Sequence, residues 1–450
     1  MDIKKLFIVH CVDTEGPIFE SIQATLSRLK IIFDIDIEPT EENLYKLQNR
    51  SIDLGGKEKQ VANLVSPCRL KFNATWHEID LMLTRLNNDD FRYALTGDNG
   101  KPWVFTWFCL DHVGFTGNNP RNRSLGDHSI FDKYRSMVGR NNFGDSIQWH
   151  YHPLPATGNV NDSGISYLTS NNIWEILSKK IIERSWFPSA FRPGFHTIRP
   201  DSHWFLEQWI PFDYGNQSSP YDENDQPDLS DGRYGDWRRA PSSWEIYHPH
   251  HDDYQAVGSC RRWVARCMNI EARIRRLSDA DIESAFARAN CGDPTVLAMT
   301  NHDFRDMYAE TIPVINRIRK AMFRYPDVEI IPIDAVNAMR GALGIGDEVV
   351  KLNCKMICKS PRHMKLEVTA LGRIFGTQPY LAIQLNGARY LWENFDSQGN
   401  GKWTFVFDEN HIPANLVTAI GVAVNSVSGH TTIANYKRGQ ESWIYSYHEK

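Results

Sequence analysis

Short apolar segments alternate with amphipathic helical segments over roughly the first 340 residues, and this alternation constrains the fold more than any other feature of the chain. Apolar segments of strand length lie at residues 6–12, 103–110, 146–152, 190–195, 211–214, 295–301 and 329–333. Segments typical of helices lie at 20–33, 76–86, 172–183, 202–209 and 307–323. The alternation predicts an α/β fold with parallel strands, either a barrel or a doubly wound sheet.

The sequence changes character near the glycine-rich segment 341–347. Beyond it, apolar and polar residues alternate at 349–358, 363–370, 380–385, 403–407 and 419–424, with turn-forming glycines between these segments. We therefore expect two domains, an α/β domain over residues 1–340 and a small β-sandwich over residues 345–450. The sandwich is expected to pack on the first domain, and sugar binding by the sandwich is the less favoured alternative.

The overall composition excludes some partners. A net charge of -5 and a pI of about 6.4 argue against a nucleic-acid partner. The N-terminal apolar segment has only the length of a strand, and no segment approaches the roughly 18 apolar residues that span a bilayer. The eight cysteines are scattered without the spacing of a zinc knuckle. We expect a reduced, cytoplasmic protein without a membrane span, and an oligomer is compatible with these features.

Two histidines lie two residues apart at the end of the apolar segment 146–152, just before Pro153. Side chains at positions i and i+2 of a strand point to the same face, so the imidazoles of His150 and His152 share one space. A single histidine in a strand is more often a core residue. Two on one face favour a site for a divalent metal.

Two carboxylates, Asp13 and Glu15, also share a face at the end of the first strand. Burying them is costly unless they are paired or bind a metal. Solvated acids near a helix N-terminus are the alternative, and the sequence alone leaves both open.

An arginine interrupts the apolar segment 190–195. A buried guanidinium needs an anionic partner, and Asp13 is the natural candidate for Arg192, whether the pair is structural or functional. Gly194 would allow the backbone to approach a ligand closely.

The strand at 295–301 delivers His302 at its C-terminal end. Histidine is the usual proton donor or acceptor near neutral pH. Asp213 and Asp303 are candidates to orient its imidazole.

Aromatic residues are numerous, with 14 Trp, 17 Tyr and 22 Phe, and most are expected in the core. Trp107, Tyr214 and Phe195 are the candidates for contact with a sugar ring. The histidine-rich segment 247–253 lies in a loop without periodicity, so we expect it to line a cleft rather than to bind metal.

The four motifs, in this order on successive strand ends, resemble the polysaccharide deacetylase superfamily (NodB-like, carbohydrate esterase family 4) over about residues 5–340. The resemblance is closest to the O-antigen-cluster branch, with its Val-Asp-Thr-Glu-Gly-Pro opening and His-x-His-Pro second motif. It implies a distorted (β/α) barrel, usually of seven strands, and one divalent metal, most often zinc. By position it implies that the metal ligands are Glu15, His150 and His152, that Asp13 is the catalytic base, that Arg192 orients this base, and that His302 is the general acid.

The motifs also depart from the commoner family pattern. Thr14 separates the two carboxylates that are more often adjacent aspartates, and the histidines are spaced by two rather than four, with Gln148 at the position four before His152. These departures leave open whether Asp13 or Glu15 is the carboxylate ligand.

The resemblance implies a hydrolase that removes an N-acetyl group from an amino sugar in surface polysaccharide or glycoconjugate biosynthesis. A backbone N–H near Gly194 and Phe195 would share the oxyanion. A cytoplasmic location suits a nucleotide- or lipid-linked sugar as substrate. The alternatives are a hydrolase of another C–N bond, in a cyclic amide or a formyl group, and a non-catalytic carbohydrate-binding protein with a degenerate site.

Overall fold

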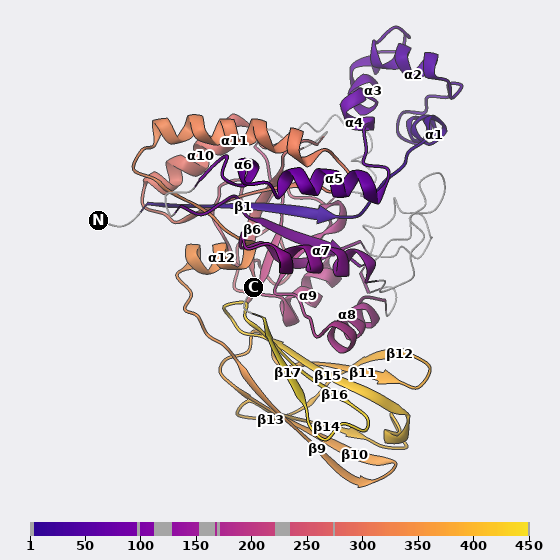
Figure 1. Ribbon diagram of the computed structural model, residues 1–450, viewed down its shortest axis with the longest axis vertical. Helices are drawn as coiled ribbons and strands as arrows, with labels where there is room; N and C mark the ends of the chain where they lie inside the picture. The colour runs from indigo at the N-terminus through magenta and orange to yellow at the C-terminus, as the bar shows by residue number, and fades with distance from the viewer. Residues whose placement is uncertain are drawn as a thin grey trace.

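The computed structural model of the protein describes residues 4–96, 100–111, 128–152, 167–168, 172–220, 235–272 and 275–448. It contains an α/β barrel, a helical extension at one end of the barrel, and a pair of antiparallel sheets formed by the C-terminal part of the chain (Figure 1). The expectation of an α/β barrel followed by a β-rich part is confirmed.

Seven parallel strands close the barrel in sequence order, because β2 pairs both with β3 and with β1. The strands are β1 (Lys5–Thr14), β2 (Phe105–Leu110), β3 (Ser146–Tyr151), β4 (Ala190–Pro193), β5 (Phe212–Asn216), β6 (Trp263–Asn269) and β7 (Thr295–His302). β1 pairs with β7 along nearly its whole length. Its other edge pairs first with an eighth strand, β8 (Glu329–Pro332), and then with β2.

Helices cover the outside of this barrel (Figure 1). They are α5 (Trp76–Leu86), α6 (Asp89–Arg92), α7 (Ser129–Arg140), α8 (Asn172–Arg184), α9 (Pro200–Trp209), α10 (Asp279–Asn290), α11 (Met307–Arg324) and α12 (Ala335–Leu343). Four residues of α12 join the apolar cluster of the barrel interior and help to fill it.

The barrel interior is apolar along most of each strand and polar where the strands end. Phe7, Val9 and Cys11 of β1 belong to the interior cluster. Because side chains on one face recur every second residue, the next interior residue of β1 is Asp13. β7 ends in the same way on His302. The C-terminal ends of the strands therefore form the polar mouth of the barrel, which is where α/β barrels carry their sites.

A helical extension is inserted between β1 and α5. It comprises α1 (Ile22–Phe33), α2 (Glu41–Gln48), α3 (Glu58–Leu64) and α4 (Pro67–Leu70). These helices pack around an apolar cluster of their own that includes Leu29, Phe33 and Val61. Figure 1 shows the extension projecting beyond the C-terminal end of β1, on the side of the barrel mouth.

The C-terminal part forms two antiparallel sheets around a separate apolar core. One sheet has the order β13-β14-β10-β9 and the other β12-β11-β15-β16-β17. Their bounds are β9 (Lys351–Ser360), β10 (His363–Leu371), β11 (Tyr380–Leu385), β12 (Arg389–Glu393), β13 (Asp396–Gly399), β14 (Lys402–Phe407), β15 (Val417–Asn425), β16 (Thr431–Lys437) and β17 (Ile444–His448).

The five-stranded sheet packs against α8 of the barrel (Figure 1). Trp174 and Trp392 stack with ring centroids 4.2 Å apart. The side chain of Asn425 donates to the carbonyl oxygens of Pro188 and Trp209 at 2.7 and 2.8 Å. Aromatic stacking and buried hydrogen bonds thus tie the sheet to the barrel surface.

In the C-terminal part, the strands β12, β13, β16 and β17 were not expected from the sequence. In the barrel, two strands differ from the sequence-based expectation. β6 was not expected, because Arg266 breaks its apolar pattern; the structure buries this arginine, which donates to Asp281 at 2.6 Å and lies over the ring of Trp244. The strand expected at 190–195 ends at Pro193. It ends there because a short turn with left-handed backbone follows it directly.

Among the described residues, no helix combines the length and the apolar character needed to cross a membrane.

Candidate metal centre

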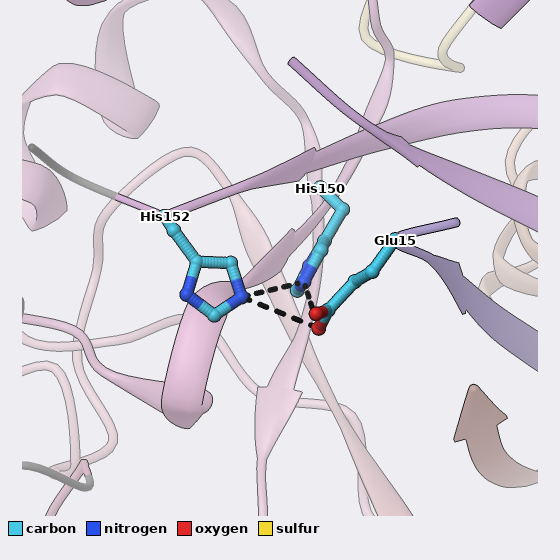
Figure 2. Close-up of side chains that lie close together, drawn as sticks. All are labelled: Glu15, His150 and His152. Atoms are coloured by element: carbon cyan, nitrogen blue, oxygen red, sulfur yellow. Dashed lines mark hydrogen bonds and ion pairs between the residues drawn. The ribbon is translucent and has the colours of Figure 1, made fainter. Parts of the chain in front are cut away.

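Glu15, His150 and His152 converge at the barrel mouth (Figure 2). Glu15 follows β1, His150 lies near the end of β3, and His152 follows that strand. All three side chains are buried, and Figure 2 shows the carboxylate facing both imidazoles. Same-face placement of residues 150 and 152, expected from the strand period, is confirmed.

The donor atoms form a compact triangle. Nε2 of His150 lies 3.1 Å from Nε2 of His152. Oε1 of Glu15 lies 3.6 Å from the first nitrogen and 3.5 Å from the second. Two imidazole nitrogens and a carboxylate oxygen this close together can hold a metal ion.

Hydrogen bonding orients His150 for this role. Its Nδ1 lies 2.9 Å from the carbonyl oxygen of Arg192, which can only accept, so Nδ1 carries a proton and, when the ring is neutral, Nε2 carries the lone pair that could bind a metal. Burial alone would lower the pKa of His150, but the carboxylates of Asp13 and Glu15 raise it above its ordinary value. The same negative field favours a cation at the triangle.

Gly194 and Phe195 form the wall behind His152. A Cβ on Gly194 would lie 2.6 Å from Nδ1 of His152, and the Phe195 ring meets the imidazole edge-on with centroids 4.7 Å apart. Phe195 and His196 have φ angles of 51° and 53°, a left-handed conformation that is costly for residues with side chains. The backbone at Gly194 was expected to approach a bound ligand closely, and in the structure it lies close to His152, a candidate metal ligand.

Replacing Gly194 by alanine is expected to weaken metal affinity roughly 10–100-fold, as the loss of groups that orient ligands commonly does. The added methyl would push the His152 ring away from the triangle. Competition with a chromophoric chelator measures the affinity. The control is Gly139→Ala on α7, where the methyl group meets no atom within 4 Å. Equal affinities in the two variants would contradict the role given to Gly194.

Asp13 and Arg192 form a buried, bidentate ion pair across the barrel. Nε and Nη2 of Arg192 donate to the two carboxylate oxygens at 2.7 and 3.0 Å, and Nη1 donates to the carbonyl oxygen of Tyr214 at 2.7 Å. Burial acts to raise the pKa of Asp13, but the Arg192 guanidinium and the nearby histidines hold it well below its usual range. The partner expected for Arg192 is confirmed.

His302 completes the polar mouth from the end of β7. Its Nε2 lies 3.9 Å from Oδ2 of Asp13 and 3.8 Å from Oε1 of Glu15. Its side chain is 26% exposed, compared with 1% for Asp13. Burial lowers the pKa of His302 to about 4, although both carboxylates act to raise it. The imidazole is therefore neutral near pH 7.

Asp303 holds the backbone that carries Glu15, a role that sequence reasoning did not assign. Its Oδ1 accepts from the Glu15 amide at 2.8 Å, and both its oxygens accept from the Gly16 amide. Tyr134 donates its hydroxyl proton to Oδ2 at 2.8 Å. The buried carboxylate directly after His302 was a signal for such a clamp. Asp213, the other residue considered for orienting His302, lies 3.3 Å from Arg262 instead.

Trp107 and Tyr214, expected to contact a sugar, are completely buried. The indole of Trp107 donates to Asp145 at 3.1 Å, and the Tyr214 hydroxyl donates to the carbonyl oxygen of Ala335 at 2.6 Å. Side chains without accessible surface offer no stacking face, so the structure assigns both to packing and corrects this expectation.

The histidine-rich segment 247–253 lies apart from the triangle. His248 stacks on Trp263 with centroids 3.4 Å apart, and His250 and His251 are exposed. Within the described part of the chain, its side chains join no group of three whose donor atoms lie close enough to share a metal.

Comparison with known proteins adds no argument to this geometry. No family model matches the chain, and no curated protein matches it. A solved structure described as "Crystal structure of Br derivative BhCBM56" covers 23% of this chain and 100% of its own length, at 12% identity and a TM-score of 0.13. So low a TM-score carries no conclusion about the fold or the function of this chain.

Proposed function

We propose that the protein is a metal-dependent hydrolase of the NodB-like deacetylase type that removes the N-acetyl group of an amino sugar in surface polysaccharide or glycoconjugate biosynthesis. The observation that supports it best is the convergence, at one barrel mouth, of the Glu15–His150–His152 triangle with Asp13 and His302. Amide hydrolysis needs an activated water, a polarised carbonyl and a protonated leaving nitrogen. This set of side chains offers a group for each need.

Zinc is the ion that we propose for the triangle. Donor atoms around a tetrahedral zinc, at bond lengths of about 2.0–2.1 Å, lie about 3.3 Å from one another. The observed separations of 3.1, 3.5 and 3.6 Å agree with this spacing. Bound there, zinc would acidify a water molecule and polarise the carbonyl.

Asp13 is the proposed base. Arg192 holds both carboxylate oxygens and keeps the pKa of Asp13 low, so the group is in its ionised form throughout the neutral range, and only this form can accept a proton from water. The bidentate contact also fixes the direction in which the carboxylate faces.

His302 is the proposed donor to the leaving nitrogen. Because it starts neutral, it must gain its proton during the reaction. Asp13, at 3.9 Å, is near enough to pass that proton after a small displacement or through one water. A backbone N–H of Gly194 or Phe195, beside His152, is the proposed second donor to the oxyanion.

Acetate release tests the proposal. Protein loaded with zinc is expected to release acetate from N-acetylated amino sugars, and chelator-treated protein is expected to release none. N-formyl sugars and cyclic amides, assayed in parallel, separate a deacetylase from a hydrolase of another C–N bond. Binding of N-acetylated sugars without turnover under any metal would overturn the catalytic proposal.

A further inference from the structure

A pocket of about 500 Å³, whose wall includes Arg305, lies close in the chain to His302 at the barrel mouth. It is formed where three parts of the chain meet: residues of α3, α4 and the segment after them, the loop that follows β6, and the start of α11 with the turn before it. The mechanism proposed above uses none of the residues that line it.

Positive charge predominates in this pocket. Four cationic side chains face three carboxylates, namely Arg69, Lys71, Arg276 and Arg305 against Glu271, Asp306 and Glu310. Glu271 and Arg276 pair with each other at 2.7 Å, which leaves three cations facing two carboxylates, and Asp306 caps α11 by accepting from the Ala309 amide. Burial raises the pKa of Glu310 to about 7, so its carboxyl is only partly ionised at neutral pH.

Arg305 is built into the pocket wall. Its guanidinium lies over the rings of Phe72 and Phe304, 5.3 and 5.7 Å from their centroids. Nη1 donates to the carbonyl oxygen of Arg69 at 3.2 Å. A planar guanidinium held in this way is preorganised to bind oxygens of an anion through its other N–H groups.

The pocket adjoins the candidate catalytic residues. The Arg305 amide donates to the carbonyl oxygen of His302 at 3.1 Å, a turn that brings the two Cα atoms within about 7 Å. Phe304, between them, stacks on the His302 ring with centroids 4.7 Å apart. The Arg305 guanidinium also packs on the Phe304 ring, so a single aromatic ring separates this cation of the pocket from the candidate general acid.

We propose that this pocket binds a phosphate group carried by the amino sugar, so that the substrate is a sugar phosphate; this inference rests on the proposed function. Arg305 and Lys71 contact the phosphate oxygens, and the Glu310 carboxyl hydrogen bonds to a hydroxyl group. A free sugar phosphate, a nucleotide-linked sugar and a lipid-linked sugar share this chemistry.

Calorimetry with N-acetylglucosamine 1-phosphate and with neutral N-acetylglucosamine tests the inference. The phosphate is expected to bind at least tenfold more tightly, and Arg305→Met and Lys71→Met are each expected to remove most of that advantage. Lys71 is exposed, so its variant carries little risk of misfolding. The matched control is Lys59→Met, an exposed cation of α3 outside the pocket, which should keep the full advantage. Equal affinities, or an advantage that survives in both pocket variants, would overturn the inference.

Binding of inorganic phosphate to chelator-treated protein separates this inference from the deacetylase proposal. Phosphate binding that Lys71→Met removes, with no acetate released from any sugar, would support an anion pocket and overturn the deacetylase. Acetate released equally fast from neutral and phosphorylated sugars, without phosphate binding, would support the deacetylase and overturn the anion pocket. Uridine diphosphate N-acetylglucosamine is a further ligand for this test. If it binds more tightly than N-acetylglucosamine 1-phosphate, the substrate is a nucleotide-linked sugar.

Discussion

The His150→Ala/His152→Ala variant is expected to hold no stoichiometric metal and to release acetate at least roughly 10³-fold more slowly than the wild type, as expected when the group that activates water is lost. Two of the three donor atoms of the triangle are removed, and a single carboxylate, Glu15, cannot retain a zinc ion against solvent. Elemental analysis of purified protein and an acetate assay measure the two effects.

The histidine-rich segment supplies a matched control for this variant. His250→Ala/His251→Ala removes two exposed imidazoles that lie outside the triangle. It is expected to keep metal and turnover. Metal retained in the first double variant, or lost in the control, would place the metal elsewhere in the protein.

Asp13→Asn is expected to reduce turnover by roughly 10³-fold or more, because removing a catalytic base costs about 10²–10⁴-fold and the amide also reorients Arg192. Metal content should remain, since the Asp13 carboxylate is bound to Arg192 and lies outside the donor triangle. If metal is lost together with turnover, Asp13 is a metal ligand, and the ligand role given to Glu15 is wrong.

The same variant should also be less stable, because it leaves the fully buried guanidinium of Arg192 without its anion, which costs about 3–5 kcal/mol. Urea unfolding measures this loss. Asp13→Asn/Arg192→Met, which removes the uncompensated charge, should recover most of the stability while staying inactive. Recovery of turnover in this double variant would show that Asp13 acts only through its ion pair.

The ion pair also has a pH signature. The pKa of Asp13 is held below its unfolded value, so its stabilisation is present above about pH 4 and is lost as the pH falls below that value. The stability difference between wild type and Asp13→Asn should therefore shrink in acid.

The strand period made much of this site predictable. His150 and His152 were placed on one face by their spacing alone, and Asp13 was expected to pair with Arg192 because an arginine in a buried strand needs an anion. Both arguments are local to one strand or depend on charge balance, so they did not require knowledge of the fold.

Other parts depended on contacts that no local pattern encodes. Asp303 clamps the backbone of a residue 288 positions away, and Gly194 is needed because of its neighbour in space, His152. Trp107 was misjudged for a different reason. Strands of a parallel barrel are buried on both faces, so their sequence does not show which aromatic side chains reach a ligand.

The pairing of β1 has a consequence for how the chain matures. β1 is synthesised before all of its partners, which begin at Phe105, Thr295 and Glu329. Glu15, His150 and His152, the candidate metal ligands, have all been synthesised by residue 152, while β7, the strand that closes the ring, has not. A nascent chain therefore carries all three residues of the triangle alongside an open, apolar strand edge while about 150 further residues, up to the end of β7, are synthesised, and such edges can recruit other chains.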